Sequence, residues 1–443
     1  MPPRPKIGLI VIGHPDYQND IGLKFAQDAV DALTERGVEV AYNGAAHTEP
    51  VAARDAAIEL VGQDLDGVIV FLGTWIECHT ACQAIREIEH LPFAVWGFNM
   101  FPWEGKREST GSFVAVSVLK GALDRMEYRC AYVVGLPSEP ETLDRAAVFA
   151  RAAHAVKRLK RTRLALIGYA AMGMFPGTFD HVLMRRHIGP DVQQMDTYTL
   201  IQAAEALPEE KVAGVAEVLR GKAEINVSDE RLMKAARLSG GLRELVQGGG
   251  FDAVNVKCQY ELSQQYGMTA CVPTSLISDE DVVAGCEGDV VVTVTMCLLK
   301  YLAGTTVYYG DILDLQGDQM MLSSCGAAAF SLCNPAEHAC IRELGHPGFD
   351  GIIASFTLKR GPLTFARLVE GSRGDYRLNY GTGTGVETEL RQGRFPALEI
   401  KIDGDPEKLW DTMASQHFAM CYGDVTAELE DVCRYLGIEP VRI

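Results

Sequence analysis

The chain has 443 residues, of which 47 % are hydrophobic and 23 % are charged, a composition typical of a globular protein with two or three domains. Its net charge of −18 at pH 7 argues against nucleic acid and anionic membranes as partners, because both require clustered Lys and Arg. No apolar segment reaches about 18 residues, so we expect no membrane-spanning helix.

The first 160 residues alternate apolar segments with helical patterns, which is typical of a doubly wound parallel sheet. Ligands of such sheets bind in the loops that follow the strands, and here those loops carry His14, Trp75 and Asn99. We expect these side chains to contact a small hydrophilic ligand, although Trp75 is equally suited to covering a strand end. The predicted strands are 7–12, 38–42, 67–72 and 93–96, and the predicted helices are 23–36, 51–62 and 80–89.

A second α/β region begins near Arg129, with predicted strands at 130–134, 163–168, 192–196 and 253–257. Lys257 ends the last of these strands, on the edge of the sheet where Glu287 and Asp311 are also expected. A lysine at this edge is suited to holding a substrate oxygen or phosphate, and it is equally suited to an ion pair.

Three acids flank an apolar segment in the second region. Glu287 and Asp289 precede an apolar stretch at 290–302 that predicts a buried helix, and Asp311 follows a predicted strand at 305–309. Acids at the edges of an apolar unit are costly to bury unless they are paired or bind a cation. A divalent metal ion is the simplest partner for them.

After Asp311 short predicted strands separated by glycine turns replace the helices, which indicates a β-barrel or sandwich. We therefore expect an α/β protein with two doubly wound parallel-sheet domains, 1–160 and 161–318, followed by a C-terminal β-barrel domain, 319–443, with closing helices. The predicted strands are 351–357, 363–370, 375–380 and 397–402; the glycine run 381–385 is predicted to be a turn, and the closing helices are 406–413 and 425–436.

The 12 cysteines show no CxxC motif and no regular spacing, which argues against a disulfide framework and against a zinc ribbon. The first residues do not have the pattern of a signal peptide. We expect a protein of the reducing cytoplasm.

The acids of the second region belong to a longer set of motifs. The set comprises Glu287-x-Asp289, the apolar helix ending at Gly304, aromatic-Gly-Asp311, Ser324-Cys325-Gly326, and Gln416-His417 followed by Gly423-Asp424. Together these motifs resemble the L-fucose isomerase family, aldose–ketose isomerases with two doubly wound domains and a C-terminal β-barrel. The resemblance extends over the whole chain.

The resemblance implies a divalent metal ion, Mn²⁺ or else Mg²⁺ or Co²⁺, bound by Glu287, Asp311 and His417. It also implies that Glu287 and Asp311 move a proton between C1 and C2 of a sugar through an ene-diol or ene-diolate. Asp289 is then expected to orient one of these acids or to cap the helix. Gln416 and Lys257 are expected to contact the sugar.

The same resemblance implies a homo-oligomer with sites near subunit interfaces, where Trp75 and Glu77 or Asn99 complete a neighbouring subunit's site. The sequence departs from the family in two places. Residues 312–318 lack the arginine and tyrosine that the family has there, and Ser324 stands where the family has a histidine. The pocket that selects the sugar is therefore different, and a pentose, a deoxyhexose and a sulfonated hexose are all candidate substrates. A metal-free sugar-binding sensor and a metal-dependent sugar epimerase are the alternative functions.

Overall fold

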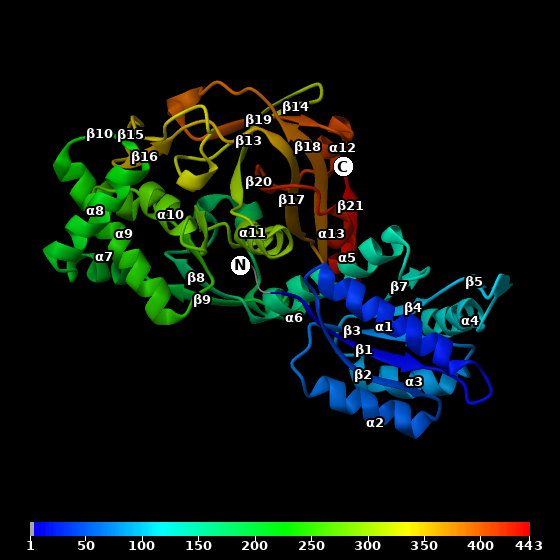
Figure 1. Cartoon of the computed structure of the whole chain (residues 1–443). Helices are drawn as coiled ribbons and strands as arrows, with labels where there is room; N and C mark the ends of the chain where they lie inside the picture. Colours follow the sequence, from blue (N-terminus) through cyan, green and yellow to red (C-terminus); the bar gives the residue numbers. More distant parts are fainter. Residues whose placement is uncertain (1–3) are drawn as a thin grey trace. The chain divides into compact units, whose positions relative to one another are not determined.

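The computed structural model describes residues 4–443, which form two compact units (Figure 1). The first contains the chain up to Lys157 together with Ala427–Gly437, and the second contains Arg158–Thr426 and Ile438–Ile443. Residues 1–3 of the expected N-terminal domain lie outside the described residues.

The first unit is built on a five-stranded parallel sheet in the order β2-β1-β3-β4-β7. Its central strands are buried because helices cover both faces: α2, α3 and α4 pack on one face, and α1 and α5 on the other. The parallel sheet predicted for this part of the chain is confirmed. Its strands are β1 (Lys6–Ile12), β2 (Glu39–His47), β3 (Gly67–Leu72), β4 (Phe93–Gly97) and β7 (Ala131–Val134); its helices are α1 (Asn19–Glu35), α2 (Pro50–Val61), α3 (Cys78–Ile88), α4 (Ser112–Arg125), α5 (Pro140–Arg161) and α13 (Thr426–Leu436); a small hairpin pairs β5 (Phe101–Trp103) with β6 (Lys106–Glu108).

The second unit contains a four-stranded parallel sheet in the order β12-β11-β8-β9, which confirms the second predicted parallel sheet. The strands are β8 (Arg163–Ile167), β9 (Asp191–Met195), β11 (Ala253–Val256) and β12 (Val283–Cys286). The helices are α6 (His181–His187), α7 (Thr197–Glu205), α8 (Glu209–Lys222), α9 (Asp229–Gly249), α10 (Cys271–Ser278) and α11 (Val290–Ala303), with short helical turns at Ala171–Gly173, Phe175–Gly177 and Glu261–Tyr266.

A seven-stranded, largely antiparallel sheet follows in the same unit, in the order β17-β20-β13-β14-β19-β18-β21, and β17 also pairs with β18. Its strands are β13 (Tyr308–Gln316), β14 (Gln319–Ser323), β17 (Gly361–Glu370), β18 (Tyr376–Gly385), β19 (Ala397–Ile402), β20 (His417–Tyr422) and β21 (Glu439–Arg442). Helix α12 (Pro406–Thr412) precedes β20, and a separate small sheet contains β10 (Glu224–Asn226), β15 (Cys340–Glu343) and β16 (Ile352–Ser355).

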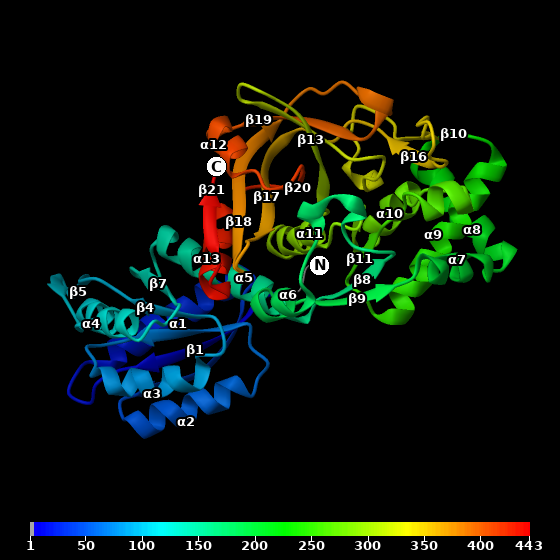
Figure 2. The same ribbon diagram turned by 180° about the vertical axis from the view of Figure 1, so that it is seen from behind.

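Helix α11 connects the two large sheets of the second unit. It packs against β11 and β12 of the parallel sheet and against β13, β17 and β20 of the antiparallel sheet (Figure 2). This position explains its apolar sequence, because its side chains are buried from Val290 to Leu299. The helix ends at Gly304, which has the left-handed φ of +65° that favours glycine.

Four local predictions were wrong. The strand expected at 130–134 in the second α/β region belongs to the first sheet, as β7. The strand expected at 305–309 begins instead at Tyr308 and continues through Asp311 to Gln316. The glycine run 381–385 is the second half of β18 and not a turn. Glycine is needed in this strand for close packing, since a Cβ on Gly381 would lie 2.6 Å from the ring of Phe365. The strand expected at 351–357 belongs to the small separate sheet.

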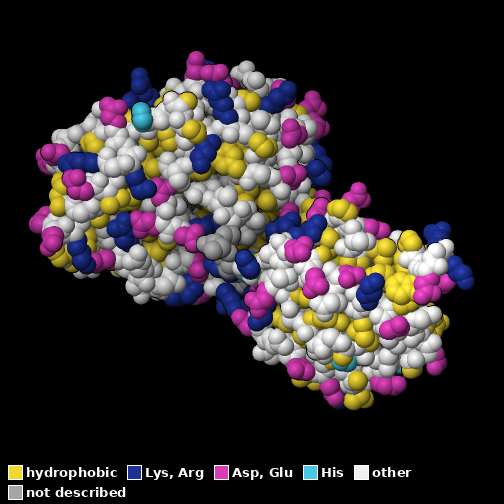
Figure 3. Space-filling view, viewed as in Figure 1, with side chains coloured by type: hydrophobic (Ala, Val, Ile, Leu, Met, Phe, Trp, Pro, Cys, Tyr) yellow, Lys and Arg dark blue, Asp and Glu magenta, His cyan; other side chains and the backbone are white. Residues whose placement is uncertain are grey.

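Within residues 4–443, no helix combines the length and the apolar composition that crossing a membrane requires. Acidic and basic side chains lie intermixed on the face drawn in Figure 3.

Asp66 in the first unit provides a test of stability. Its buried carboxylate accepts hydrogen bonds from the backbone N–H of Lys6 (2.8 Å) and from His154 Nδ1 (2.9 Å), and it lies 3.1 Å from Lys157 Nζ. Burial raises the pKa of Asp66, but the hydrogen bonds from His154 and Lys6 outweigh it and hold the pKa below its ordinary value of 3.8.

We expect Asp66→Asn to destabilise this unit by about 1.5–3 kcal/mol at pH 7, because hydrogen bonds to a charged group are lost. The difference from wild type should be fully present above pH 3.8 and should disappear as the pH falls through the lowered folded pKa. Urea unfolding followed by tryptophan fluorescence measures it, and the exposed control Asp55→Asn should change stability by less than about 0.5 kcal/mol. Equal effects of the two substitutions would contradict the expectation.

Candidate functional site

A tight turn between β12 and α11 places the first two acids. Glu287 and Gly288 both have left-handed φ values, +63° and +74°, and a Cβ on Gly288 would lie 2.5 Å from the carbonyl oxygen of Tyr169. The buried Asn255 side chain on β11 holds this turn: its Nδ2 donates to the carbonyl oxygens of Cys286 and Asp289, and its Oδ1 accepts the N–H of Gly288. Glu287 and Asp289 are thereby fixed at the carboxyl edge of the parallel sheet.

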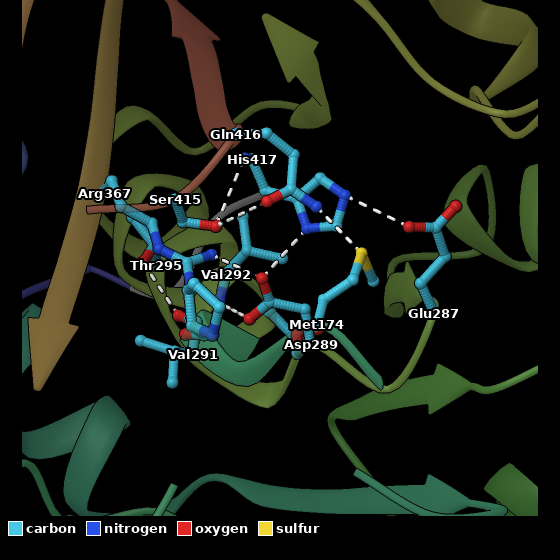
Figure 4. Close-up of polar contacts among 12 residues, drawn as sticks. Met174, Glu287, Asp289, Val291, Val292, Thr295, Arg367, Ser415, Gln416 and His417 are labelled. Carbon is cyan, nitrogen blue, oxygen red and sulfur yellow. Dashed lines mark hydrogen bonds and ion pairs between the residues drawn. The ribbon is translucent and has the colours of Figure 1, made fainter. Parts of the chain in front are cut away.

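Asp289 has three partners and is almost fully buried. Its Oδ1 accepts the backbone N–H of Val292 (2.9 Å) and so caps α11, while its Oδ2 accepts from Arg367 Nη1 (2.7 Å) and His417 Nδ1 (2.9 Å) (Figure 4). Burial raises the pKa of Asp289, but the charges of Arg367 and His417 outweigh it and hold the pKa below its ordinary value. The partners of Asp289 therefore favour its charged form, and its Oδ2 orients the imidazole of His417.

His417 lies on β20 directly opposite Asp311 on β13. Because Nδ1 faces Asp289, the other ring nitrogen, Nε2, faces Glu287 Oε2 at 3.2 Å and Asp311 Oδ1 at 3.3 Å. Burial lowers the pKa of His417, but the hydrogen bonds to the surrounding carboxylates outweigh it and raise the pKa well above the ordinary value. Nε2 is buried and makes no well-formed hydrogen bond within residues 4–443.

The structure thus brings together Glu287, Asp311 and His417, which are far apart in the sequence. Asp311 is the most open of the three, with 29 % of its side chain exposed, so the group is accessible from that side. Gln416 lies next to His417, and its Nε2 donates to Met174 Sδ (Figure 4).

Lys257 lies at the same edge of the parallel sheet. Strands β11 and β12 pair with Val256 opposite Cys286, so Lys257 and Glu287 follow at neighbouring strand ends. The Lys257 ammonium pairs with the carboxylate of Glu261 and lies 3.9 Å from the ring centroid of Tyr169.

The other residues expected in the site belong to the first unit. The rings of His14 and Trp75 are 5.1 Å apart at neighbouring strand ends, and Tyr17 contacts both rings. Asn99 is exposed after β4. The acids and His417 belong to the second unit.

Sequence reasoning missed Arg367 and Asn255. Each is a polar residue inside an apolar strand, Arg367 in LTFARLV of β17 and Asn255 in AVNV of β11, and that interruption is the signal that could have identified them. Arg367 is almost fully buried, and its Nη2 donates to the carbonyl oxygen of Pro176 (3.1 Å).

Glu287, Asp311 and His417 are the residues best placed to hold a metal ion, although as they stand no three His, Cys, Asp or Glu side chains of residues 4–443 are arranged to hold one. His417 Nε2 lies 3.2 Å from Glu287 Oε2 and 3.3 Å from Asp311 Oδ1, so these three side chains would be the ones to hold an ion.

A cavity of about 800 Å³ lies at the opposite end of α11, lined by Lys300, Gly304, Lys359 and Arg360 among others. Because α11 has 14 residues, this cavity is about 20 Å from Glu287 and Asp289, which lie before the first turn of the helix.

No model of a known protein family matches the chain. Two curated relatives are named sulfoquinovose isomerase: the protein of Priestia aryabhattai is 26 % identical over 366 residues, with 80 % of each chain covered, and that of Alkalicoccus urumqiensis is 24 % identical over 369 residues, with 82 % of each chain covered. A solved LacI family transcriptional regulator from Arthrobacter sp. FB24, in complex with lactose, is 19 % identical, with 68 % of this chain and 91 % of that chain covered; its TM-score of 0.18 is too low to indicate a shared fold.

We expect Arg367→Leu to lower the free energy of unfolding by about 3–5 kcal/mol, because it leaves the Asp289 carboxylate buried without its guanidinium partner. Adding Asp289→Asn should recover part of the loss, since no uncompensated charge remains. Urea denaturation measures both effects. The exposed control Arg360→Leu should cost less than about 0.5 kcal/mol, and a comparable loss in this control would contradict the role of the buried pair.

Proposed function

We propose that this protein is an aldose–ketose isomerase that acts on a sulfonated hexose. The observation that carries the proposal is the convergence of Glu287, Asp311 and His417 Nε2 at the edge of the parallel sheet. The relatives named sulfoquinovose isomerase, which align over about four fifths of both chains, support the substrate class. Sulfoquinovose itself is the first substrate to test.

Isomerisation transfers a proton between C1 and C2 of the sugar. The protein must therefore supply one side chain that removes the proton and one that returns it. Asp289 is unsuited to either role because Arg367 and His417 hold it as a carboxylate behind the imidazole. Glu287 and Asp311 are the two carboxylates that face His417 Nε2, on the more open side of the imidazole. We therefore assign the proton transfer to Glu287 and Asp311.

The proposal includes a divalent ion, Mn²⁺ or else Mg²⁺ or Co²⁺, held by Glu287, Asp311 and His417 Nε2. Two carboxylates and one imidazole suit such an ion, and an imidazole with a carboxylate behind the ring, as Asp289 is behind His417, is typical of a metal-binding histidine. When bound, the ion supplies positive charge beside the sugar oxygens on C1 and C2.

We also infer kinship with the L-fucose isomerase family. The strand pairings that lead from β17 through β20, β13, β14, β19 and β18 back to β17 support the C-terminal β-barrel that this kinship implies.

Glu287→Gln and Asp311→Asn should each lower kcat for sulfoquinovose at least about 100-fold while the fold, measured by circular dichroism, is retained. Asp314→Asn is the matched control, because Asp314 lies exposed on the same strand, and it should retain activity. In D₂O the wild-type ketose product should acquire deuterium at C1. Product that forms without deuterium would indicate a hydride shift and would contradict the roles of the two acids.

Metal binding can be measured independently of activity. We expect wild-type protein stripped with a chelator to bind one Mn²⁺ in isothermal titration calorimetry, and we expect His417→Ala to weaken this binding more than 10-fold because it removes one of three ligands. His346→Ala, at an exposed histidine, is the control. Wild-type protein that binds no Mn²⁺, Mg²⁺ or Co²⁺ would contradict the metal site.

A further inference from the structure

We infer that Lys257 binds the sulfonate of the substrate and so makes the site selective for a sulfonated sugar. The inference rests on the proposed function and assigns a residue to the substrate's charged end. A sulfonate is compact, permanently anionic and offers three acceptor oxygens. The structure must therefore place a cation with unused donors near the proton-transfer acids.

Lys257 has the required position. Strands β11 and β12 are hydrogen-bonded neighbours in a parallel sheet, and the N–H of Glu287 donates to the carbonyl oxygen of Val256 (3.2 Å). Neighbouring strands are about 4.8 Å apart, so Lys257 and Glu287 start from adjacent points on the same edge. A hexose whose C1 and C2 lie against Glu287 and Asp311 can thus extend its far end toward Lys257.

Lys257 also has unused hydrogen-bonding capacity. Its side chain is fully buried, and an ammonium carries three N–H donors. The carboxylate of Glu261 takes one donor, and the remaining described neighbours of the ammonium are the ring faces of Tyr169 (3.9 Å) and Tyr260 (5.3 Å). Ring faces stabilise a cation but leave its N–H donors available to oxygen acceptors.

Four other cations of the second unit do not meet the requirement. Arg367 uses its guanidinium on Asp289 and on the carbonyl oxygen of Pro176. Lys300, Lys359 and Arg360 lie at the cavity at the opposite end of α11, about 20 Å away, which a single hexose cannot span.

Binding of a sulfonate to Lys257 would replace the ion pair that Lys257 makes with Glu261. Its carboxylate is 38 % exposed, whereas the ammonium is buried, so Glu261 can move into solvent when a sulfonate takes its place. Tyr169 and Tyr260 are each about half exposed, so entry displaces surface rings and not core residues. A neutral sugar offers no replacement for the carboxylate and leaves the Lys257–Glu261 pair intact.

The exchange predicts opposite effects of two substitutions. Lys257→Gln should raise KM for sulfoquinovose about 10- to 100-fold, because charge-assisted hydrogen bonds to the sulfonate are lost. Glu261→Gln removes the competing carboxylate and should lower that KM. A residue that served only as half of a structural ion pair would instead lose function on either substitution.

The experiment compares sulfoquinovose with quinovose, which has hydrogen in place of the sulfonate, for wild type, Lys257→Gln, Glu261→Gln and the control Lys300→Gln. We expect the ratio of kcat/KM for sulfoquinovose over quinovose to fall 10- to 100-fold in Lys257→Gln, to rise in Glu261→Gln and to stay unchanged in Lys300→Gln. An unchanged ratio in Lys257→Gln, or a fall in Glu261→Gln, overturns the inference.

Two further readouts separate this inference from the proposed function. If wild type isomerises no sugar, the proposed function fails, and calorimetric binding of sulfoquinovose to wild type and to Lys257→Gln still tests the inference: equal affinities, or no binding to wild type, overturn it. If Lys257→Gln does not fold, Glu261→Gln still tests the inference because it keeps Lys257. A lower KM for sulfoquinovose supports the inference, and a higher KM overturns it.

Discussion

One buried carboxylate, that of Asp289, holds helix α11, strand β17 and strand β20 in a single arrangement. A lone charge in this dry core would be costly, and the guanidinium of Arg367 offsets that cost while hydrogen bonds occupy the remaining lone pairs. Because Oδ2 takes the hydrogen bond of His417 Nδ1, the opposite ring nitrogen must face Glu287 and Asp311. The orientation of His417 toward Glu287 and Asp311 therefore depends on the buried ion pair of Asp289 and Arg367.

The group formed by Glu287, Asp311 and His417 is assembled from two different sheets. Glu287 comes from the carboxyl end of a parallel strand, whereas Asp311 and His417 come from adjacent antiparallel strands. Helix α11 packs against both sheets, and its buried apolar side chains keep it from shifting between them. Contacts with both sheets explain why this helix carries almost no polar surface although it begins beside the buried acids.

The parallel strands and the apolar helix could be predicted because their signals are local: continuous apolar runs bounded by glycine or acids. The candidate site could be predicted only in part. His417 has no local signal, since its partner Asp311 lies across a strand pairing that spans more than a hundred positions, and it was found through a resemblance of motifs. Arg367 interrupts an apolar strand, but its partner Asp289 lies 78 positions away, so the sequence does not show what the arginine pairs with. Gly381 of β18 was misinterpreted because its role, the close approach of Phe365, exists only in the folded sheet.

The hairpin of β13 and β14 extends beyond the register that places the acids. Pairing of β13 with β20 ends where Asp311 meets His417, and the hairpin continues past this point to a tip at 317–318, where the carbonyl oxygen of Asp318 accepts the N–H of Ile402 on β19 (2.8 Å). Exposed side chains of this tip can be exchanged without shifting the strand register on which Asp311 and His417 depend. The side chains of the hairpin beyond Asp311 can therefore change in evolution while the geometry of Asp311 and His417 is inherited intact.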